Sequence, residues 1–301
     1  MIRYDSIPYW PEDVYLDSNG LKDETLDTLS PMNEISYIML KEIDHQKNIG
    51  QIAEIVCNRY DWPLEQVKPD VLELIHQLNQ GYLINIQSPR SMKQKVRDRF
   101  ISLFYFLRTF QGTRWNIRKR IGLDKNRSFW KLFWQIAISV SRVMVMHVFL
   151  LSIVLYFIFT FLQFPAMVGA IIFFIGLISG FILHEYGHVA TFYLLASRNQ
   201  HAFFALKRGT FQVIKKELDA KKECWVTLMG PLLPTIVGGI MFCILFAVGD
   251  IPNWITWMAS GLFTFHLVWL LPIFVDGKKL WSLLRMKPEK KLEKGKGEKT
   301  A

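Results

Sequence analysis

The feature that most constrains this chain is an apolar stretch, residues 173–196, with ionisable side chains set into its second half. These side chains are His184, Glu185 and His188. A charged side chain at bilayer depth costs about 2.5–3.5 kcal/mol, so such residues indicate a functional site. His184 and His188 are four residues apart and lie on one face of a helix. The His-Glu-x-x-His pattern predicts two imidazole ligands for one metal ion, with Glu185 beside them as general base.

The apolar residues of this 301-residue chain are unevenly distributed. The first 130 residues have the composition of a water-soluble protein, and the polar segment 1–33 lacks the apolar core of a cleavable signal peptide. Long apolar runs then predict four membrane spans, each long enough for a bilayer. They lie near residues 140–161, 166–196, 225–248 and 254–274. We expect a mainly helical, polytopic membrane bundle that follows a small N-terminal α+β domain.

The formal charge of +10 comes mostly from two clusters, residues 90–131 and 278–299. Such a basic chain could bind nucleic acid, but both clusters flank predicted spans, where basic residues set the topology and contact lipid headgroups. We therefore expect a lipid bilayer as partner and no nucleic acid. The link after the second span is also basic, whereas residues 163–165 and 249–253 carry no Lys or Arg. This asymmetry predicts an integral membrane protein with both termini in the cytoplasm.

This topology predicts a third metal ligand. His184 and His188 fall in the cytoplasmic half of the second span, and the fourth span delivers Asp276 to the same side. Three protein ligands with an open fourth position are typical of catalytic zinc sites. Gly176 and Gly180 precede the histidines at four-residue steps, so the metal-binding face is expected to pack closely against another helix.

Two other histidines lie in predicted spans, His147 and His266. A single membrane histidine more often bonds to a neighbouring helix than to a metal. In a continuous helix His266 would lie about 15 Å from Asp276. It is therefore expected to be too far away to bind the same ion.

The segment between the second and third spans is predicted to form a hairpin of residues 201–206 and 210–214. Its simplest role is a connection, and its functional role would be an edge strand that holds a substrate in extended form. Just beyond it, Pro231 and Pro234 are expected to disturb the third span near its cytoplasmic end.

The N-terminal region is predicted to contain three helices, at residues 34–44, 48–60 and 64–80, followed by a strand at 82–86. Asn33 and Asn48 are suitable N-caps, and Gly81 is a natural stop. With short extended fragments before the helices, this is the pattern of a small winged-helix domain. The basic, aromatic-rich segment 88–129 is expected to be an amphipathic helix on an anionic membrane surface.

Residues 32–83 resemble the PqqD-like leader-peptide-recognition family. The resemblance lies in Asn33 at the entry to the first helix, in NIGQIA at 48–53 and in LNQGYL at 78–83. It implies that the domain binds the leader of a ribosomally made precursor peptide as an added strand, through backbone hydrogen bonds at a sheet edge. A DNA-binding or merely structural winged helix is the alternative.

The membrane part resembles the site-2-protease family of intramembrane zinc metalloproteases. The resemblance covers about 140 residues and lies in HEYGH at 184–188, Gly-Pro at 230–231 and Asp-Gly at 276–277. It implies a Zn²⁺ cofactor held by His184, His188 and Asp276, with Glu185 as the catalytic base.

The chain departs from that family's pattern at two places. Pro234 stands where members commonly carry an Asn thought to orient substrate. Trp269 stands at the Asn position of the family's Asn-x-x-Pro run, and Pro272 is one residue closer to Asp276 than is usual. These departures change positions that in the family concern substrate orientation, and they remove neither a ligand nor the base.

The expected domains are a recognition domain (1–87), a basic connector (88–130), a membrane metalloprotease domain (131–277) and a basic tail (278–301). The combination resembles peptide zinc metalloproteases of modified-peptide (epipeptide-type) gene clusters. This implies cleavage of a leader-bound precursor before export, with a peptide exporter and a modifying enzyme as further partners. Two alternatives remain, a regulated intramembrane protease acting on a transmembrane signalling protein and a non-enzymatic immunity or transport-accessory membrane protein.

Overall fold

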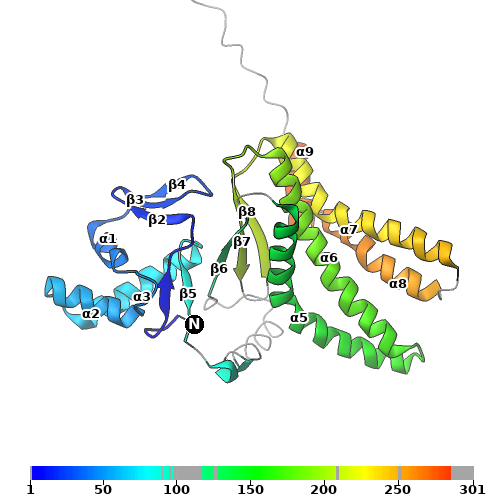
Figure 1. The fold of residues 1–301 in the computed structure, drawn as a ribbon, viewed down its shortest axis with the longest axis horizontal. Helices are drawn as coiled ribbons and strands as arrows, with labels where there is room; N and C mark the ends of the chain where they lie inside the picture. Colours follow the sequence, from blue (N-terminus) through cyan, green and yellow to red (C-terminus); the bar gives the residue numbers. More distant parts are fainter. Residues whose placement is uncertain are drawn as a thin grey trace, which may run out of the picture.

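The computed structural model describes residues 2–89, 117–124, 128–207, 210–249 and 253–285, with several positions between 91 and 100. The N-terminal part is a small α+β unit, as predicted, drawn in blue and cyan in Figure 1. It contains two small antiparallel sheets, one of order β1-β5 and one of order β2-β3-β4. Its elements are β1 (Ile7–Tyr9), β2 (Val14–Asp17), β3 (Gly20–Asp23), β4 (Thr28–Ser30), α1 (Glu34–Lys41), α2 (Ile49–Tyr60), α3 (Leu64–Gln80) and β5 (Asn85–Gln87).

Local side-chain chemistry explains where these helices begin and end. Asn48 caps α2 with a complete capping box, because its side chain accepts from Gln51 N–H and the Gln51 side chain accepts from Asn48 N–H. The α1 helix ends at Lys41, three residues earlier than predicted, and the carboxylate of Asp44 then accepts the N–H groups of residues 46 and 47. The predicted bounds of α3 are confirmed, and the strand predicted at 82–86 lies at 85–87 because Tyr82 takes a left-handed φ of 61° in the turn.

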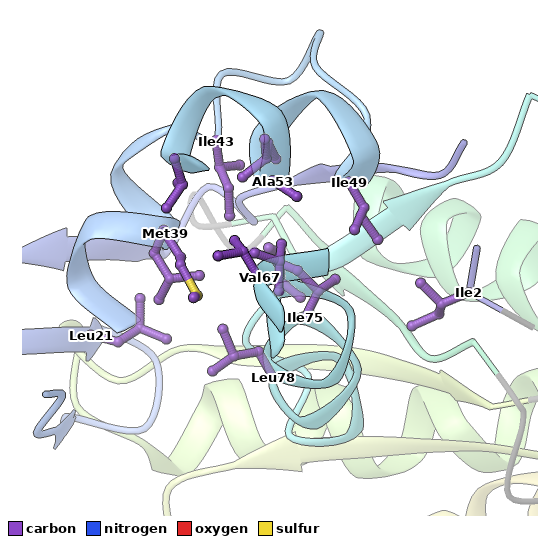
Figure 2. Packing of buried hydrophobic residues seen from close by; sticks show 14 of the residues in the cluster. Ile2, Leu21, Met39, Ile43, Ile49, Ala53, Val67, Ile75 and Leu78 are labelled. Carbon is purple, nitrogen blue, oxygen red and sulfur yellow. The ribbon is translucent and has the colours of Figure 1, made fainter. Parts of the chain in front are cut away.

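One continuous apolar core holds this unit together. Ile49 and Ile52 from α2, Ile75 from α3 and Leu21 from β3 are each at most 1% exposed. Figure 2 shows where these elements pack together, with Val67 and Ile75 of α3 facing Ala53 of α2 and Met39 of α1. Burying each such side chain contributes about 1.5–3 kcal/mol, so the helices are stabilised mainly by this shared core.

Within the part of the chain that the structure describes, three helices are long and apolar enough to cross a membrane, and a bent pair makes a fourth candidate span. The prediction of a polytopic helical bundle is therefore confirmed at this level. In Figure 1 α5–α6 and α7–α8 form two helical hairpins, which meet through contacts of α6 with α7 and α8. The helices are α5 (Phe129–Phe161), α6 (Ala166–Leu195), α7 (Ala220–Val248), α8 (Asn253–Thr264) with the 3-10 turn η1 (Phe265–Leu270), and α9 (Val275–Arg285).

Two details of the predicted spans are wrong. The first helix begins at Phe129 rather than near residue 140, and its 33 residues extend about 50 Å, beyond the thickness of a hydrocarbon core. The fourth span is not one helix, since α8 passes into η1 and the chain bends by 46° before α9. Pro231 and Pro234 lie inside α7, which continues as a helix from Ala220 to Val248.

The hairpin predicted between the second and third spans is confirmed as β7 (Ala202–Lys207) and β8 (Thr210–Lys215). A third strand, β6 (Lys119–Gly122), pairs antiparallel with β7. The expectation of an amphipathic helix over 88–129 is wrong at this strand, because residues 119–122 gain a partner strand that local sequence does not reveal. Residues 101–116, which carry most of that prediction, lie outside the described part of the chain. In Figure 1 the β6-β7-β8 sheet stands between the N-terminal unit and the helices.

Strand β6 also joins the sheet to the N-terminal unit. The side-chain amides of Asn79 and Asn85 each bond a backbone N–H and C=O of one residue, Arg118 and Arg120 respectively. These bonds satisfy the edge of β6 that faces away from β7. The two parts of the molecule therefore share a hydrogen-bonded strand.

A buried charge cluster reinforces the same junction. The Arg120 guanidinium, on β6, is fully buried and pairs with Asp13 and Asp23 of the N-terminal unit. It also lies 3.8 Å above the ring centroid of Phe203 on β7. Burial by itself would lower the pKa of Arg120, but the hydrogen bonds and charges of the two carboxylates together outweigh it and raise that pKa.

Candidate metal centre

The two histidines of α6 lie side by side, as their spacing predicts. His184 and His188 are on successive turns of one face, with ring centroids 5.0 Å apart. The same face carries Gly176 and Gly180, where a Cβ would come within 2.7 Å of Leu262 and 2.5 Å of His266. The expected close packing at these glycines is confirmed, and the partner is the α8–η1 segment.

Asp276 reaches the histidines from the first turn of α9. Its Oδ2 lies 3.0 Å from His184 Nε2 and 3.5 Å from His188 Nε2. The bend before α9 makes this possible, and Gly277 is part of it, because a Cβ there would fall 1.9 Å from the carbonyl oxygen of Leu271. One ligand atom from each of the three side chains lies within 4.8 Å of the other two. Residues 92 positions apart in the sequence therefore form one cluster.

The geometry of this cluster fits a zinc ion. Ligand atoms at 2.0–2.2 Å from a tetrahedral zinc are about 3.3–3.6 Å apart, close to the observed 3.0 and 3.5 Å. His188 Nδ1 bonds the carbonyl oxygen of Val226 at 2.7 Å, which leaves Nε2 free to act as a ligand. Gly230 keeps the space beside that nitrogen open, since a Cβ there would lie 2.2 Å from His188 Nε2.

Glu185 is buried beside the histidines and lines a pocket of about 640 Å³. The pocket also reaches strand β8, whose residues Phe211, Gln212 and Val213 form part of its wall. Within the described sheet, β8 pairs with β7 on one side and with no strand on the other. The carboxylate of Glu185, the three potential ligands and an unpaired strand edge thus share one pocket.

A second charged cluster in the same pocket was not foreseen from the sequence. Glu223, buried in the first turn of α7, pairs with Lys215 of β8 and Lys279 of α9. Burial lowers the pKa of Lys215. The cluster ties β8 and α9 to the start of α7, so it fixes the helix that carries Asp276 against the strand that lines the pocket. No local pattern marks Glu223, because its partners are contributed by other elements.

His266 lies beside His184, a contact that the sequence did not predict, while the cluster of potential ligands found among the described residues does not include it. Its Nδ1 is 3.4 Å from His184 Nδ1, and the ring centroids are 5.3 Å apart. The expectation assumed a continuous helix from His266 to Asp276, whereas η1 and the bend fold the chain back. Trp269 lies at the same place, 5.9 Å from His184 between ring centroids, so the position at which the chain departs from the family pattern is part of the pocket wall. Pro234 is buried within α7, and His147 bonds the carbonyl of Val143 in its own helix.

Comparison with known proteins identifies the N-terminal unit. Residues 25–84 match the family model PqqD, described as coenzyme PQQ synthesis protein D. The resemblance inferred for residues 32–83 is thereby confirmed. No curated protein and no solved structure matches the chain.

Proposed function

We propose that this chain is a membrane-embedded zinc metalloendopeptidase that cleaves a ribosomally made precursor peptide, bound through its leader, for maturation before export. The observation that carries the proposal is the meeting of His184, His188 and Asp276 beside Glu185 in one pocket. Two imidazoles and one carboxylate, with room for a further ligand, are the donor set of catalytic zinc sites.

In this proposal Glu185 and His188 have distinct roles in peptide hydrolysis. When bound, Zn²⁺ supplies a Lewis acid that polarises the scissile carbonyl and lowers the pKa of water. Glu185 takes a proton from the attacking water as the new C–O bond forms, and returns it to the amide nitrogen as the C–N bond breaks. His188 keeps the required tautomer because its Nδ1–H donates to the Val226 carbonyl.

The unpaired edge of β8 supports a role in holding the substrate. A scissile bond must be extended to be attacked, because a helix hides its carbonyls in backbone hydrogen bonds. A peptide that adds to the edge of β8 would be extended, and β8 lines the same pocket as Glu185 and the ligand cluster. The Glu223 cluster would keep this edge fixed relative to Asp276.

The N-terminal unit supports the choice of substrate. PqqD domains bind precursor peptides. In this chain the β2-β3-β4 sheet has two outer strands, β2 and β4, that could accept an added strand. The unit is joined through β6 to the sheet that contains β8, so a leader bound on one side and a cleavage site on the other would belong to one connected structure.

The apolar helices support a location in the bilayer. The charge asymmetry of the chain's links supports cytoplasmic termini, and the resemblance to modified-peptide gene clusters implies a bacterial plasma membrane. The precursor would then arrive from the cytoplasmic side, where modifying enzymes act, and the product would pass to a peptide exporter.

Substitution of the base tests the proposal. The full chain and its Glu185→Gln variant are co-expressed with candidate precursor peptides, and the peptide products are compared by mass spectrometry. The wild type is expected to yield a defined peptide fragment that Glu185→Gln does not yield. Both proteins are expected to insert into the membrane and to have the same zinc content. Equal cleavage by the two proteins would refute the role of Glu185, and zinc-free wild-type protein would refute the metal centre.

A further inference from the structure

His266 is a buried titratable side chain that none of the steps above uses. It is 1% exposed and lies in η1, at the broken part of the fourth span. It contacts a proposed metal ligand, since His266 Nδ1 and His184 Nδ1 are 3.4 Å apart. Two ring nitrogens at this distance form a hydrogen bond only if one carries a proton and the other does not.

The position of Asp276 decides which nitrogen donates. His184 Nε2 is the atom that faces Asp276, so a metal in the cluster takes the Nε2 lone pair. A neutral imidazole that binds through Nε2 carries its proton on Nδ1. His184 Nδ1 is therefore the donor, His266 Nδ1 is the acceptor, and the proton of His266 is on Nε2.

The second histidine of the motif has the same arrangement with a different acceptor. His188 donates from Nδ1 to the carbonyl oxygen of Val226, while its Nε2 faces Asp276. The Nδ1 atom of each of the two histidines, which faces away from Asp276, is thus directed at an acceptor on another segment. The acceptor is on α7 for His188 and on η1 for His184. Such partners orient ligating imidazoles and raise their basicity.

The surroundings hold His266 in this position. A Cβ on Gly180 would lie 2.5 Å from His266 Nε2, so the ring occupies the space left by the glycine. The ring of Phe181 packs edge-on against it, with centroids 5.2 Å apart. The imidazole is therefore fixed by α6 itself, one turn before the ligand that it contacts.

From these contacts we propose that His266 is a positioning residue for the metal centre, which accepts the Nδ1 proton of His184 and so holds that ligand in its metal-binding tautomer and orientation. The inference rests on the proposed function, because it assumes that the cluster binds zinc. Loss of such an outer partner typically weakens metal binding by about 10–100-fold.

Zinc affinity of the detergent-solubilised full chain, measured by competition with a chelator, tests this role. His266→Phe keeps an aromatic ring but offers no acceptor, and its zinc affinity is expected to fall about 10–100-fold. His266→Asn places an amide oxygen near the position of Nδ1 and is expected to recover a large part of the loss. His147→Phe, in α5, is the matched control and is expected to bind zinc as the wild type does.

A second pair of variants tests the same contact without replacing the histidine. Gly180→Ala would push His266 away and is expected to weaken zinc binding, whereas Gly261→Ala, whose Cβ would meet nothing within 4 Å, is expected to have no effect. Unchanged affinity in His266→Phe, or equal losses in His266→Phe and His266→Asn, would overturn the positioning role while leaving the proposed function intact. Failure of the wild type to bind zinc would overturn both.

Discussion

The N-terminal unit and the candidate metal centre are built in opposite ways. The N-terminal unit buries apolar side chains from neighbouring helices, such as Ile52 and Ile75, and its helix caps are local. The metal centre places polar atoms inside apolar helices and gathers them from positions as far apart as His184 and Asp276. In the first region the stabilising contacts follow from sequence periodicity, and in the second they depend on how the spans break and pack.

This difference predicts different sensitivities. A core formed by many apolar contacts loses stability in proportion to the atoms removed. A cluster of ligand atoms loses its function when one atom is displaced, even if the helices stay folded. Variants in the two regions can therefore separate stability from metal binding.

The largest change in zinc affinity among these variants is expected at Gly230, which leaves space beside His188 and is not itself a potential ligand. Gly230→Ala would bring a Cβ to 2.2 Å from His188 Nε2 without altering any ligand. Zinc affinity is expected to fall by more than the about 10–100-fold of a lost outer partner, because a ligand itself is displaced. Gly239→Ala, in the same helix, would meet nothing within 4 Å and is expected to bind zinc normally. Chelator competition measures both, and equal affinities would show that His188 is not a ligand.

A large loss of stability is expected at the junction of the two regions. Asp23→Ala leaves the buried Arg120 with Asp13 alone and is expected to cost about 3 kcal/mol or more. Hydrogen exchange of β5 and β6 in the full chain measures the loss. The control is Lys216→Ala, which removes an exposed ion pair with Asp27 and is expected to cost much less than Asp23→Ala does. Equal effects would argue against the buried charge cluster as the element that joins the regions.

A smaller effect is expected at a helix cap of the N-terminal unit. Asn48→Ala removes the capping box of α2 and is expected to destabilise that helix by about 1 kcal/mol. Hydrogen exchange of α2 reports the change. Asn58→Ala, exposed within the same helix, is expected to be neutral or slightly stabilising, since Ala has the higher helix propensity. Zinc content should stay unchanged in both, and a loss of zinc would contradict the separation of the two regions.

The smallest effect is a pH dependence of the turn before α2. Backbone N–H groups of Lys47 and Gln46 lower the pKa of Asp44 from 3.8 to about 2. Because the folded-state pKa lies below the unfolded one, the stabilisation is present above about pH 4 and is lost as the pH falls towards 2. Comparison of the acid unfolding of Asp44→Asn with that of the wild type measures it. The variant is expected to have a shallower pH dependence in this window, and identical profiles would exclude the contribution.

The fold of the N-terminal unit was largely predictable, because its signals are local. Asn48 and Gln51 mark the start of α2, and the apolar stripe of α3 gives its bounds. Strand β6 was not predictable, since residues 119–122 form a strand only when β7 and Asn85 are placed beside them. The same holds for β1, which pairs with β5 across nearly the whole unit.

At the candidate metal centre, the spacing of residues 184–188 and the charge asymmetry were enough to select two histidines and one aspartate, His184, His188 and Asp276. The structure places these three side chains next to one another. The geometry of a continuous helix did not predict the contact of His266 with His184, because the α8 helix gives way to η1 and a bend. Glu223 could not be found from its neighbours in sequence, since its cationic partners lie in β8 and α9. Local chemistry thus selects candidate ligands, whereas the side chains that contact and orient them depend on tertiary packing.

The most direct test of the central claim is the zinc content of the purified full chain, compared with that of Asp276→Asn and Glu185→Gln. The proposed centre predicts about one zinc ion per chain in the wild type and in Glu185→Gln, and loss of zinc in Asp276→Asn, because only Asp276 is a ligand among the two carboxylates. A wild-type protein without zinc, or an Asp276→Asn protein with unchanged zinc, would contradict it.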